Sequence, residues 1–332
     1  MLSEETGGTT MGLVQDGVLG LYLLSQTDQF FDRSRFYEML QFDDQLPHPA
    51  VFTPGGVRLW TGKQLISMRV PSEVSMHAYC GGESFLVHKG ELLHGTVTKK
   101  AVGPGCGGLI HATCQQIDEN AGGRLMTSLQ QLASLFLKQH GFSIGIDDCI
   151  ASAGVRADCI RVIEETTAST PKGDENQILG HMNALLPALG PLVMQQQTNL
   201  TTIVRSGSKG SSINVAQICA CVGQVQVGGV RPHGDFPLPG THGHISRGFC
   251  PRSLSDGLSA SEMFSHMAGT REGACRPARS VVSCVGLISR APHHRSCGHC
   301  HQNSRNRVHY AALDKNIGRS ARCVGRYGPW QQ

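Results

Sequence analysis

A run of small residues around one lysine is the first stretch whose composition suggests chemistry. The segment RSGSKGSSINVAQICACVGQ covers residues 205–224, and Lys209 lies among glycines and serines ahead of an apolar run. A lysine beside a helix N-terminus can hold a polyphosphate, because the ammonium group and the free backbone N–H groups both attract anions. The spacing excludes a Walker loop and a dinucleotide fingerprint. Lys209 is therefore a candidate phosphate ligand, and a solvated lysine on a turn is the alternative.

A Cys/His cluster near the end of the chain has the residue types that zinc binds. The segment HHRSCGHCH at 293–301 contains Cys297 and Cys300 among four histidines. A structural zinc site needs a second, separated ligand pair, and the surrounding residues offer only irregular spacing for one. We expect no zinc site here.

Other pairs of acidic residues and of histidines are weaker candidates for metal binding. Asp43–Asp44 and Asp147–Asp148 are expected to lie on the surface or to cap helices, and His242 and His244 are expected to lie on a solvated loop. No metal ligand is therefore assigned to this chain.

The spacing of apolar residues predicts the helices and strands that position these side chains. Leu125, Leu129, Leu132 and Phe136 share one face of a helix predicted over 123–140, and Gly141 follows as its C-terminal cap. We also expect a hairpin in SFLVHKGELLHGTV, with its turn at Lys-Gly.

Three further predictions concern the second half of the chain. The polar stretch 165–177 reads as a loop or linker, and the helix in ILGHMNALLPALG is expected to break at Pro187. Ser259 and Glu262 form a capping-box pattern that predicts a helix from about residue 259. The fold class expected from these elements is α+β.

Composition and charge narrow the class of protein. The 332 residues carry a net charge of +4, but residues 274–332 hold ten Lys/Arg and one acid. The N-terminus does not resemble a signal peptide, and the apolar runs are too short to span a membrane, so we expect an intracellular protein. The 13 cysteines are scattered, which favours reduced, buried thiols.

Several motifs, in order, resemble a known family. The segment SGSKGSSINVAQICACVGQ is similar to the funnel region of the largest subunit of eukaryotic multisubunit DNA-directed RNA polymerases. The polymerase II type is most similar, and polymerase III is the alternative. The other matching segments are MGLVQD, LPHPAVFTPGGVRLWTGKQLIS, GELLHGTVTKKAVGPGCGGLIH, HGFSIGIDD, ENQILGHMNAL, SRGF and GLSASEMFSHMAGTREG.

The resemblance implies a domain organisation. It implies a pore-like domain over 1–150 with short strands and helices, a mainly helical funnel-like domain over 151–257, and the start of the bridge helix at 258–273. The tail, 274–332, matches nothing in the family. If the codons for residues 274–277 are read one base later, they permit Leu-Val-Asp, the residues that follow Gly273 in the family. We therefore expect that the tail comes from a shifted reading frame. We also expect the tail to be poorly ordered.

Residue roles follow from the same resemblance. Lys209 matches the lysine that faces the incoming nucleoside triphosphate. Contacts with the channel and the bridge helix are implied for a further set: Asn214, Gln217, His266, Arg271 and Glu272.

The implied enzyme is a nucleotidyltransferase that needs Mg²⁺. The family's Asp triplet, which holds that ion, does not occur in this sequence, so we expect the chain to be an inactive internal portion of a larger subunit without bound Mg²⁺. The implied partners are other polymerase subunits, including the second-largest, template DNA, RNA, nucleoside triphosphates and a transcript-cleavage factor. The implied location is the nucleus.

Two alternatives remain open at the level of sequence. One is a noncatalytic piece that binds polymerase subunits or cleavage factors. The other is an unrelated metal or nucleic-acid binder that acts through the basic tail.

Overall fold

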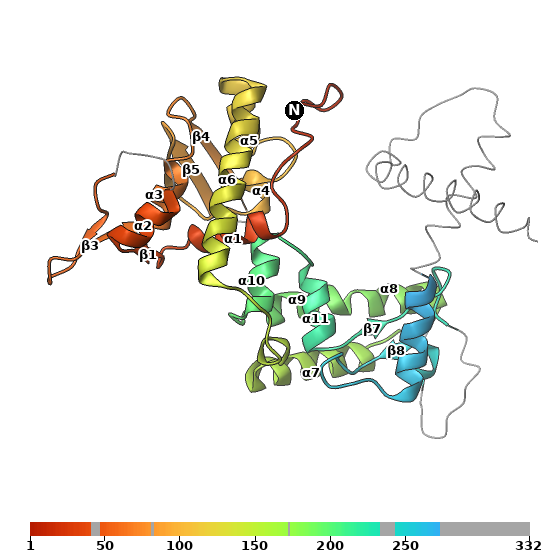
Figure 1. The fold of residues 1–332 in the computed structure, drawn as a ribbon. Helices are drawn as coiled ribbons and strands as arrows, with labels where there is room; N and C mark the ends of the chain where they lie inside the picture. Colours follow the sequence, from red (N-terminus) through yellow and green to blue (C-terminus); the bar gives the residue numbers. More distant parts are fainter. Residues whose placement is uncertain (41–46, 81–82, 172, 233–242, 273–332) are drawn as a thin grey trace, which may run out of the picture. The chain divides into compact units, whose positions relative to one another are not determined.

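The computed structural model describes residues 1–40, 47–80, 83–171, 173–232 and 243–272. The sequence predictions for the 274–332 tail and for Asp43–Asp44, Cys297, Cys300 and His242 lie outside these residues. The described part has two hydrophobic cores that follow each other along the chain. Residues 1–272 form one unit, and Figure 1 shows the order of its elements.

The first core is built from helices and two small antiparallel sheets. Its largest buried side chains include Trp60, Phe36, Phe85 and Phe136. Its elements are α1 (Asp16–Leu24), β1 (Phe30–Phe31), α2 (Arg33–Leu40), β2 (Val51–Phe52), β3 (Arg58–Thr61), α3 (Gly62–Ser67), β4 (Met76–Cys80), β5 (Glu83–His88), β6 (Glu91–His94), α4 (Lys99–Val102), α5 (Leu109–Gln116) and α6 (Glu119–His140).

The long helix α6 is the helix against which other helices of the first core pack. The four predicted core positions, Leu125 to Phe136, are all buried, and α1 and α5 pack against this helix. Asp118 caps its N-terminus by accepting from Ala121 N, and Gly141 ends it with φ 71°. The predicted helix and its cap are therefore confirmed, with a start four residues earlier.

The two sheets of the first core are three-stranded. Their strand orders are β1-β3-β2 and β4-β5-β6, and every pairing is antiparallel. The predicted hairpin is confirmed as β5–β6. Lys89 and Gly90 both have positive φ, 47° and 80°, as the two central residues of a type I′ turn require.

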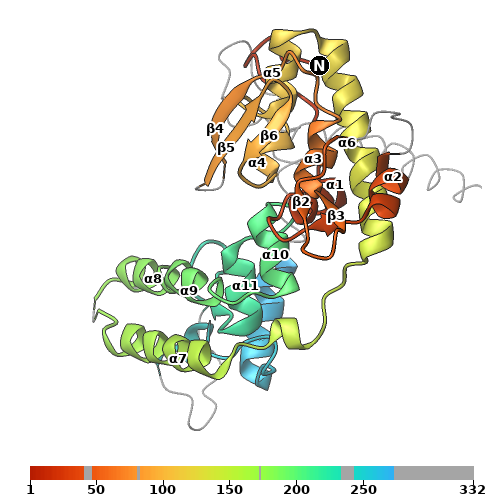
Figure 2. The ribbon, with the colours of Figure 1, turned by 90° about the vertical axis from the view of Figure 1, so that its left-hand side faces the viewer.

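The second core is mainly helical. Its elements are the 3₁₀ turn η1 (Asp147–Cys149), α7 (Ala153–Ala168), α8 (Glu175–Asn183), α9 (Leu185–Val193), α10 (Asn199–Ser206), α11 (Ser212–Cys219), β7 (Gly223–Gln224), η2 (Ile245–Arg247) and β8 (Phe249–Cys250). Helix α7 contacts both α8 and α9, alongside which it runs (Figure 2). Together with the first core, this arrangement confirms the α+β fold class.

Two boundaries in the second core differ from the sequence predictions. The predicted linker 165–177 is wrong at both ends, because α7 continues to Ala168 and α8 begins at Glu175. The predicted break at Pro187 is also wrong. The helices separate at Ala184, and Pro187 occupies the first turn of α9, where its missing N–H costs no hydrogen bond.

The last described residues form a helix over 260–272. Glu262 Oε2 accepts from Ser259 N at 2.7 Å, and Glu262 N donates to Ser259 Oγ at 3.5 Å. The predicted capping box is therefore confirmed. Glu262 is itself buried, which ties the start of this helix to the second core.

The cysteines described in the second core are free thiols. Burial raises the pKa of Cys219 to about 11 and the pKa values of Cys221 and Cys250 to about 12. A thiol with such a pKa is neutral near pH 7, so these three side chains behave as small apolar residues. Their burial agrees with the sequence prediction.

Candidate functional site

The turn that carries Lys209 is shaped by two glycines. Helix α10 ends at Gly207, whose φ is 74°, and Gly210 has φ 75° just before α11 begins. Both values lie in the left-handed region, where a side chain is strained and glycine is not. Lys209 lies between them and is exposed, and it forms no ion pair with another described residue.

Hydrogen bonds fix the turn on both sides of the lysine. Ser208 Oγ donates to Gln15 O at 2.9 Å, which joins the turn to the residue preceding α1. On the other side, Ser211 N and Ser211 Oγ both donate to Asn214 Oδ1 at 2.9 Å. The amide oxygen of Asn214 therefore caps α11 and holds the turn that presents Lys209.

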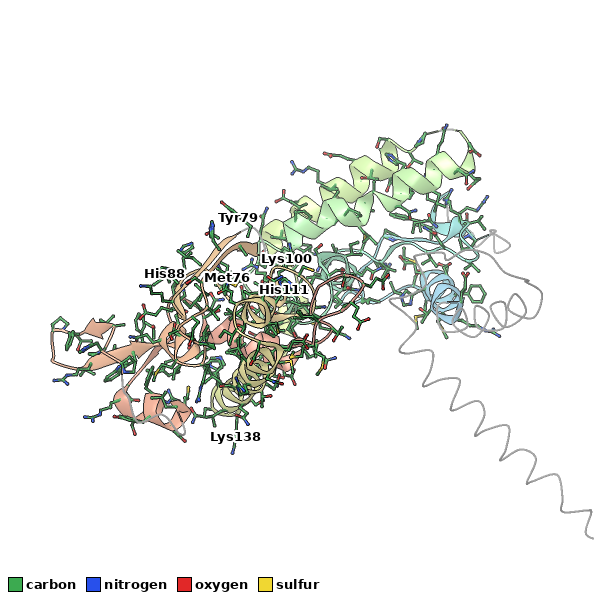
Figure 3. The ribbon with its side chains drawn as sticks, turned by 90° about the horizontal axis from the view of Figure 1, so that it is seen from above. Met76, Tyr79, His88, Lys100, His111 and Lys138 are labelled. Atoms are coloured by element: carbon green, nitrogen blue, oxygen red, sulfur yellow. The ribbon has the colours of Figure 1, made fainter. Side chains whose placement is uncertain are left out.

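The start of α4 contacts the same turn. A Cβ atom at residue 207 would lie 2.8 Å from Cβ of Lys99, so the absence of a side chain at Gly207 permits this approach. Lys99 and Lys100 are both exposed, and Lys100 is labelled in Figure 3. The buried hydroxyl of Thr98, the preceding residue, has no hydrogen-bond partner among the described residues. Lys99 and Lys100 are thus cations that the sequence reasoning did not assign to this site.

The remaining predicted site residues lie elsewhere in the second core. Gln217 is half-buried, and its Nε2 donates a long, 3.5 Å bond to Val222 O. In the 260–272 helix, His266 is half-buried and Arg271 is exposed. Glu272 Oε2 accepts from Gly228 N at 2.6 Å. No hydrogen bond or ion pair among the described residues joins this helix to the Lys209 turn.

The Asp147–Asp148 pair has the structural role expected of it. Asp148 Oδ1 accepts from Asn199 N at 2.9 Å, at the N-terminus of α10, and Asp148 Oδ2 accepts from Gly145 N at 2.8 Å. Its carboxylate therefore caps the helix that leads to Lys209. Within the described ranges, no group of three or more His, Cys, Asp or Glu side chains is placed to hold a metal ion.

A polar network in the second core is centred on the buried side chain of Arg231. The side chain of Arg231 is 3% exposed, and it contacts Gln224 Oε1 at 3.2 Å, Glu175 Oε2 at 3.4 Å and His244 Nδ1 at 3.3 Å. Arg247 Nη2 lies 3.3 Å from Glu175 Oε1. Burial, followed by the charge of Arg231, lowers the pKa of His244. The predicted solvated loop is thus wrong for His244, because this residue belongs to the network.

Local sequence patterns do not indicate this network. Arg231 and Arg247 lie in turn-rich stretches, GGVRP and ISRGF, and Glu175 lies in the segment taken for a linker. Each residue alone reads as a solvated charge. Only the pairing of β7 with β8 and the start of α8 bring the three together.

Comparisons with known proteins give separate matches for the first and the second half of the described chain. Residues 1–149 match the family model "RNA polymerase Rpb1, domain 3", and residues 158–250 match "RNA polymerase Rpb1, domain 4". The DNA-directed RNA polymerase II subunit RPB1-B of Trypanosoma brucei brucei is 29% identical over 315 residues, a match that covers 82% of this chain. The chain belongs to the RNA polymerase largest-subunit family.

The two family domains correspond to the two hydrophobic cores. The domain 3 match contains all the buried residues of the first core, and the domain 4 match contains nearly all those of the second. The Lys209 turn belongs to the domain 4 match, whereas Lys99 belongs to the domain 3 match. The chain spans 18% of the length of the trypanosome relative.

Proposed function

We propose that the chain forms part of the nucleotide-entry pore and funnel of a DNA-directed RNA polymerase. Membership of the largest-subunit family supports a role in nucleotidyl transfer in general. The observation that carries the finer proposal is the Lys209 turn. It presents an exposed cation without an ion pair among the described residues, and it rests on Lys99, beside a further exposed lysine.

The chemistry of this turn suits a polyphosphate. A nucleoside triphosphate carries several negative charges, and a lysine binds phosphate as a point charge without imposing one geometry. The turn is held by Ser208 and Asn214, so the ammonium group is presented from a fixed base. Lys209 would attract and position the triphosphate, and Lys99 and Lys100 would add to the local positive potential.

Magnesium belongs to the proposed parent enzyme rather than to these residues. The ion would stabilise the charges of the transferred phosphoryl group. The described residues do not fit it, because no cluster of carboxylates is placed as a ligand set. No step is therefore assigned to Mg²⁺ on this chain.

The proposed partners follow from the same role. They are other polymerase subunits, including the second-largest, template DNA and RNA in the assembled enzyme, and a transcript-cleavage factor at the funnel. Contacts of Asn214, Gln217, His266, Arg271 and Glu272 with the channel and bridge helix remain part of this proposal. The proposed location is the nucleus. No helix among the described residues has both the length and the apolar character needed to cross a membrane.

The test is single-nucleotide addition by a complete polymerase assembled with this chain's residues in its largest subunit. We expect Lys209→Ala to lower kcat/KM for the nucleotide about tenfold to a hundredfold, since a hydrogen bond to a charged group contributes about 1.5–3 kcal/mol. Lys209→Arg is expected to restore part of this loss, because the charge remains while the shape differs.

The control for charge alone is Lys138→Ala. Lys138 is an exposed lysine at the C-terminal end of α6, and its loss should leave kcat/KM unchanged. Template affinity, measured in parallel, should be unchanged in both alanine variants. Unaltered nucleotide use by Lys209→Ala would leave Lys209 as a solvated lysine and remove the proposed role.

A further inference from the structure

A pocket on the first core shares no residue with the Lys209 turn. Its volume is about 350 Å³, which falls within the range of small-ligand sites. It lies between the segment 69–73, which follows α3, and the start of α6. Its lining residues are Arg69, Pro71, Glu73, Ile117, Ala121, Arg124, Leu125 and Ser128.

Arg69 provides a fixed but incompletely bonded guanidinium group. Its Nη2 donates to Leu40 O at 2.6 Å and to Met39 O at 3.3 Å, at the end of α2. Its Nε is buried and has no hydrogen-bond partner among the described residues. Burial closes this Nε to a ligand. The remaining nitrogen, Nη1, forms no hydrogen bond with another described residue and is the donor that Arg69 can offer to the pocket.

Arg124 provides a second cation from α6. It is exposed and forms no ion pair with another described residue. Ser128 follows four residues later, so it shares this face of the helix and adds a hydroxyl group. Glu73 is the single acid of the lining, and Ser72 Oγ lies 3.4 Å from its Oε2. The lining therefore keeps a net positive charge.

The rest of the lining is apolar. Leu125 and Ala121 are buried members of α6, and Pro71 and Ile117 complete the apolar part. A ligand that matches the whole lining needs an anionic end for the two arginines and an apolar body for these four residues. A bare inorganic anion would satisfy only the first requirement.

We propose that this pocket binds a carboxylate carried on an apolar body. A carboxylate accepts hydrogen bonds from guanidinium groups, and Nη1 of Arg69 is a donor without a hydrogen-bond partner among the described residues. The carboxylate belongs either to a free small acid or to an acidic side chain next to an apolar one in a peptide. Both sources present the same chemistry to Arg69 and Arg124.

The experiment follows the arginine Nε–H resonances of the full chain labelled with ¹⁵N-arginine. The Arg69 resonance is identified by its loss in Arg69→Lys. The first probe is 3-phenylpropionate, and its uncharged match is 3-phenylpropionamide. The second probe is the peptide acetyl-Glu-Phe-amide, with acetyl-Gln-Phe-amide as its match. We expect a saturable shift of the Arg69 resonance with at least one acid and none with its amide, and the tighter acid identifies the source.

Matched variants complete the test. Arg124→Ala should weaken binding of the acid about tenfold, the effect expected for one hydrogen bond to a charged group. Lys138→Ala removes an exposed cation from the same helix, 14 residues further on or roughly 21 Å along its axis, and should leave binding unchanged (Figure 3). The proposal is overturned by the absence of a saturable shift with both acids, by equal shifts with the amides, or by unchanged binding in Arg124→Ala.

Discussion

Lys209 and Arg231 are cations of the same core with opposite environments. Lys209 is exposed on a turn and forms no ion pair among the described residues, whereas the side chain of Arg231 is 3% exposed and contacts three polar side chains. An exposed cation can meet a ligand at little desolvation cost. A buried one is held by its partners, and removing a partner leaves an uncompensated charge. These environments agree with the binding role proposed for Lys209, and they indicate a structural role for Arg231.

The Arg231 network makes stability depend on pH through His244. Its folded-state pKa is lowered, first by burial and then by Arg231, while in the unfolded chain the pKa is about 6.5. The unfolded state therefore binds the proton more tightly, so stability is fully present above about pH 6.5 and falls as the pH drops toward the folded-state pKa.

The measurement is urea unfolding of the full chain at pH 7.5 and pH 5.5. We expect the wild type to lose more stability between these values than His244→Gln, which cannot take up the proton. His88→Gln is the control, because His88 is exposed at the end of β5 (Figure 3). An identical loss of stability in wild type and His244→Gln would contradict the assignment.

Helix contacts in the first core depend on close approach at a glycine. A Cβ atom at Gly20 in α1 would lie 2.8 Å from the carbonyl oxygen of Ala133 and 3.0 Å from its Cβ, both in α6. Because a neighbouring backbone atom blocks the space, α1 could accept a methyl group only by moving away from α6. The glycine therefore sets the separation of the two helices that form the centre of this core.

Two glycine substitutions should have effects of opposite sign. Gly20→Ala is expected to destabilise the chain by about 1–3 kcal/mol, the usual cost of overpacking. Gly154→Ala, in α7, meets nothing within 4 Å and should stabilise by about 0.5–1 kcal/mol, since alanine is the better helix former. Thermal unfolding of both variants checks this, and a neutral Gly20→Ala would show that α1 and α6 can separate without cost.

The elements that sequence could predict are those with strong local signals. Helix α6 has a complete apolar stripe, and the Lys89–Gly90 turn has the residues that a type I′ turn needs. The end of α7 is not predicted because its last turn, ETTA, is polar and contains two threonines, which are poor helix formers. The contact of Gly207 with Lys99 and the placement of His244 depend on tertiary packing, which no local pattern encodes.

On the scale of the whole molecule, the described chain combines two cores that match two successive domains of one subunit family. The catalytic acids of that family are expected to form an Asp triplet, and the printed 332 residues contain none. Phosphoryl transfer without ligands for its metal ions lacks the main source of charge stabilisation. Under the proposed function, Lys209 would bind the phosphates of the substrate, and the described residues would supply no metal ligand.

The purified chain should therefore make no RNA. We expect no template-dependent nucleotide incorporation at any Mg²⁺ concentration, measured with a primed template and labelled nucleoside triphosphates. A complete polymerase from any source serves as the positive control in the same buffer. Incorporation that requires the chain, the template and Mg²⁺ together would overturn this expectation.

The hydrogen bond from Ser208 to Gln15 has a consequence for the order of folding. It joins residues 193 positions apart, and the contact between Gly207 and Lys99 also links the second core to the first. Contacts between such distant positions form slowly, because a long loop must close before they stabilise anything. During synthesis, α1 and α4 leave the ribosome long before the turn that rests on them. We therefore expect the Lys209 turn to be among the last features that the folding chain completes.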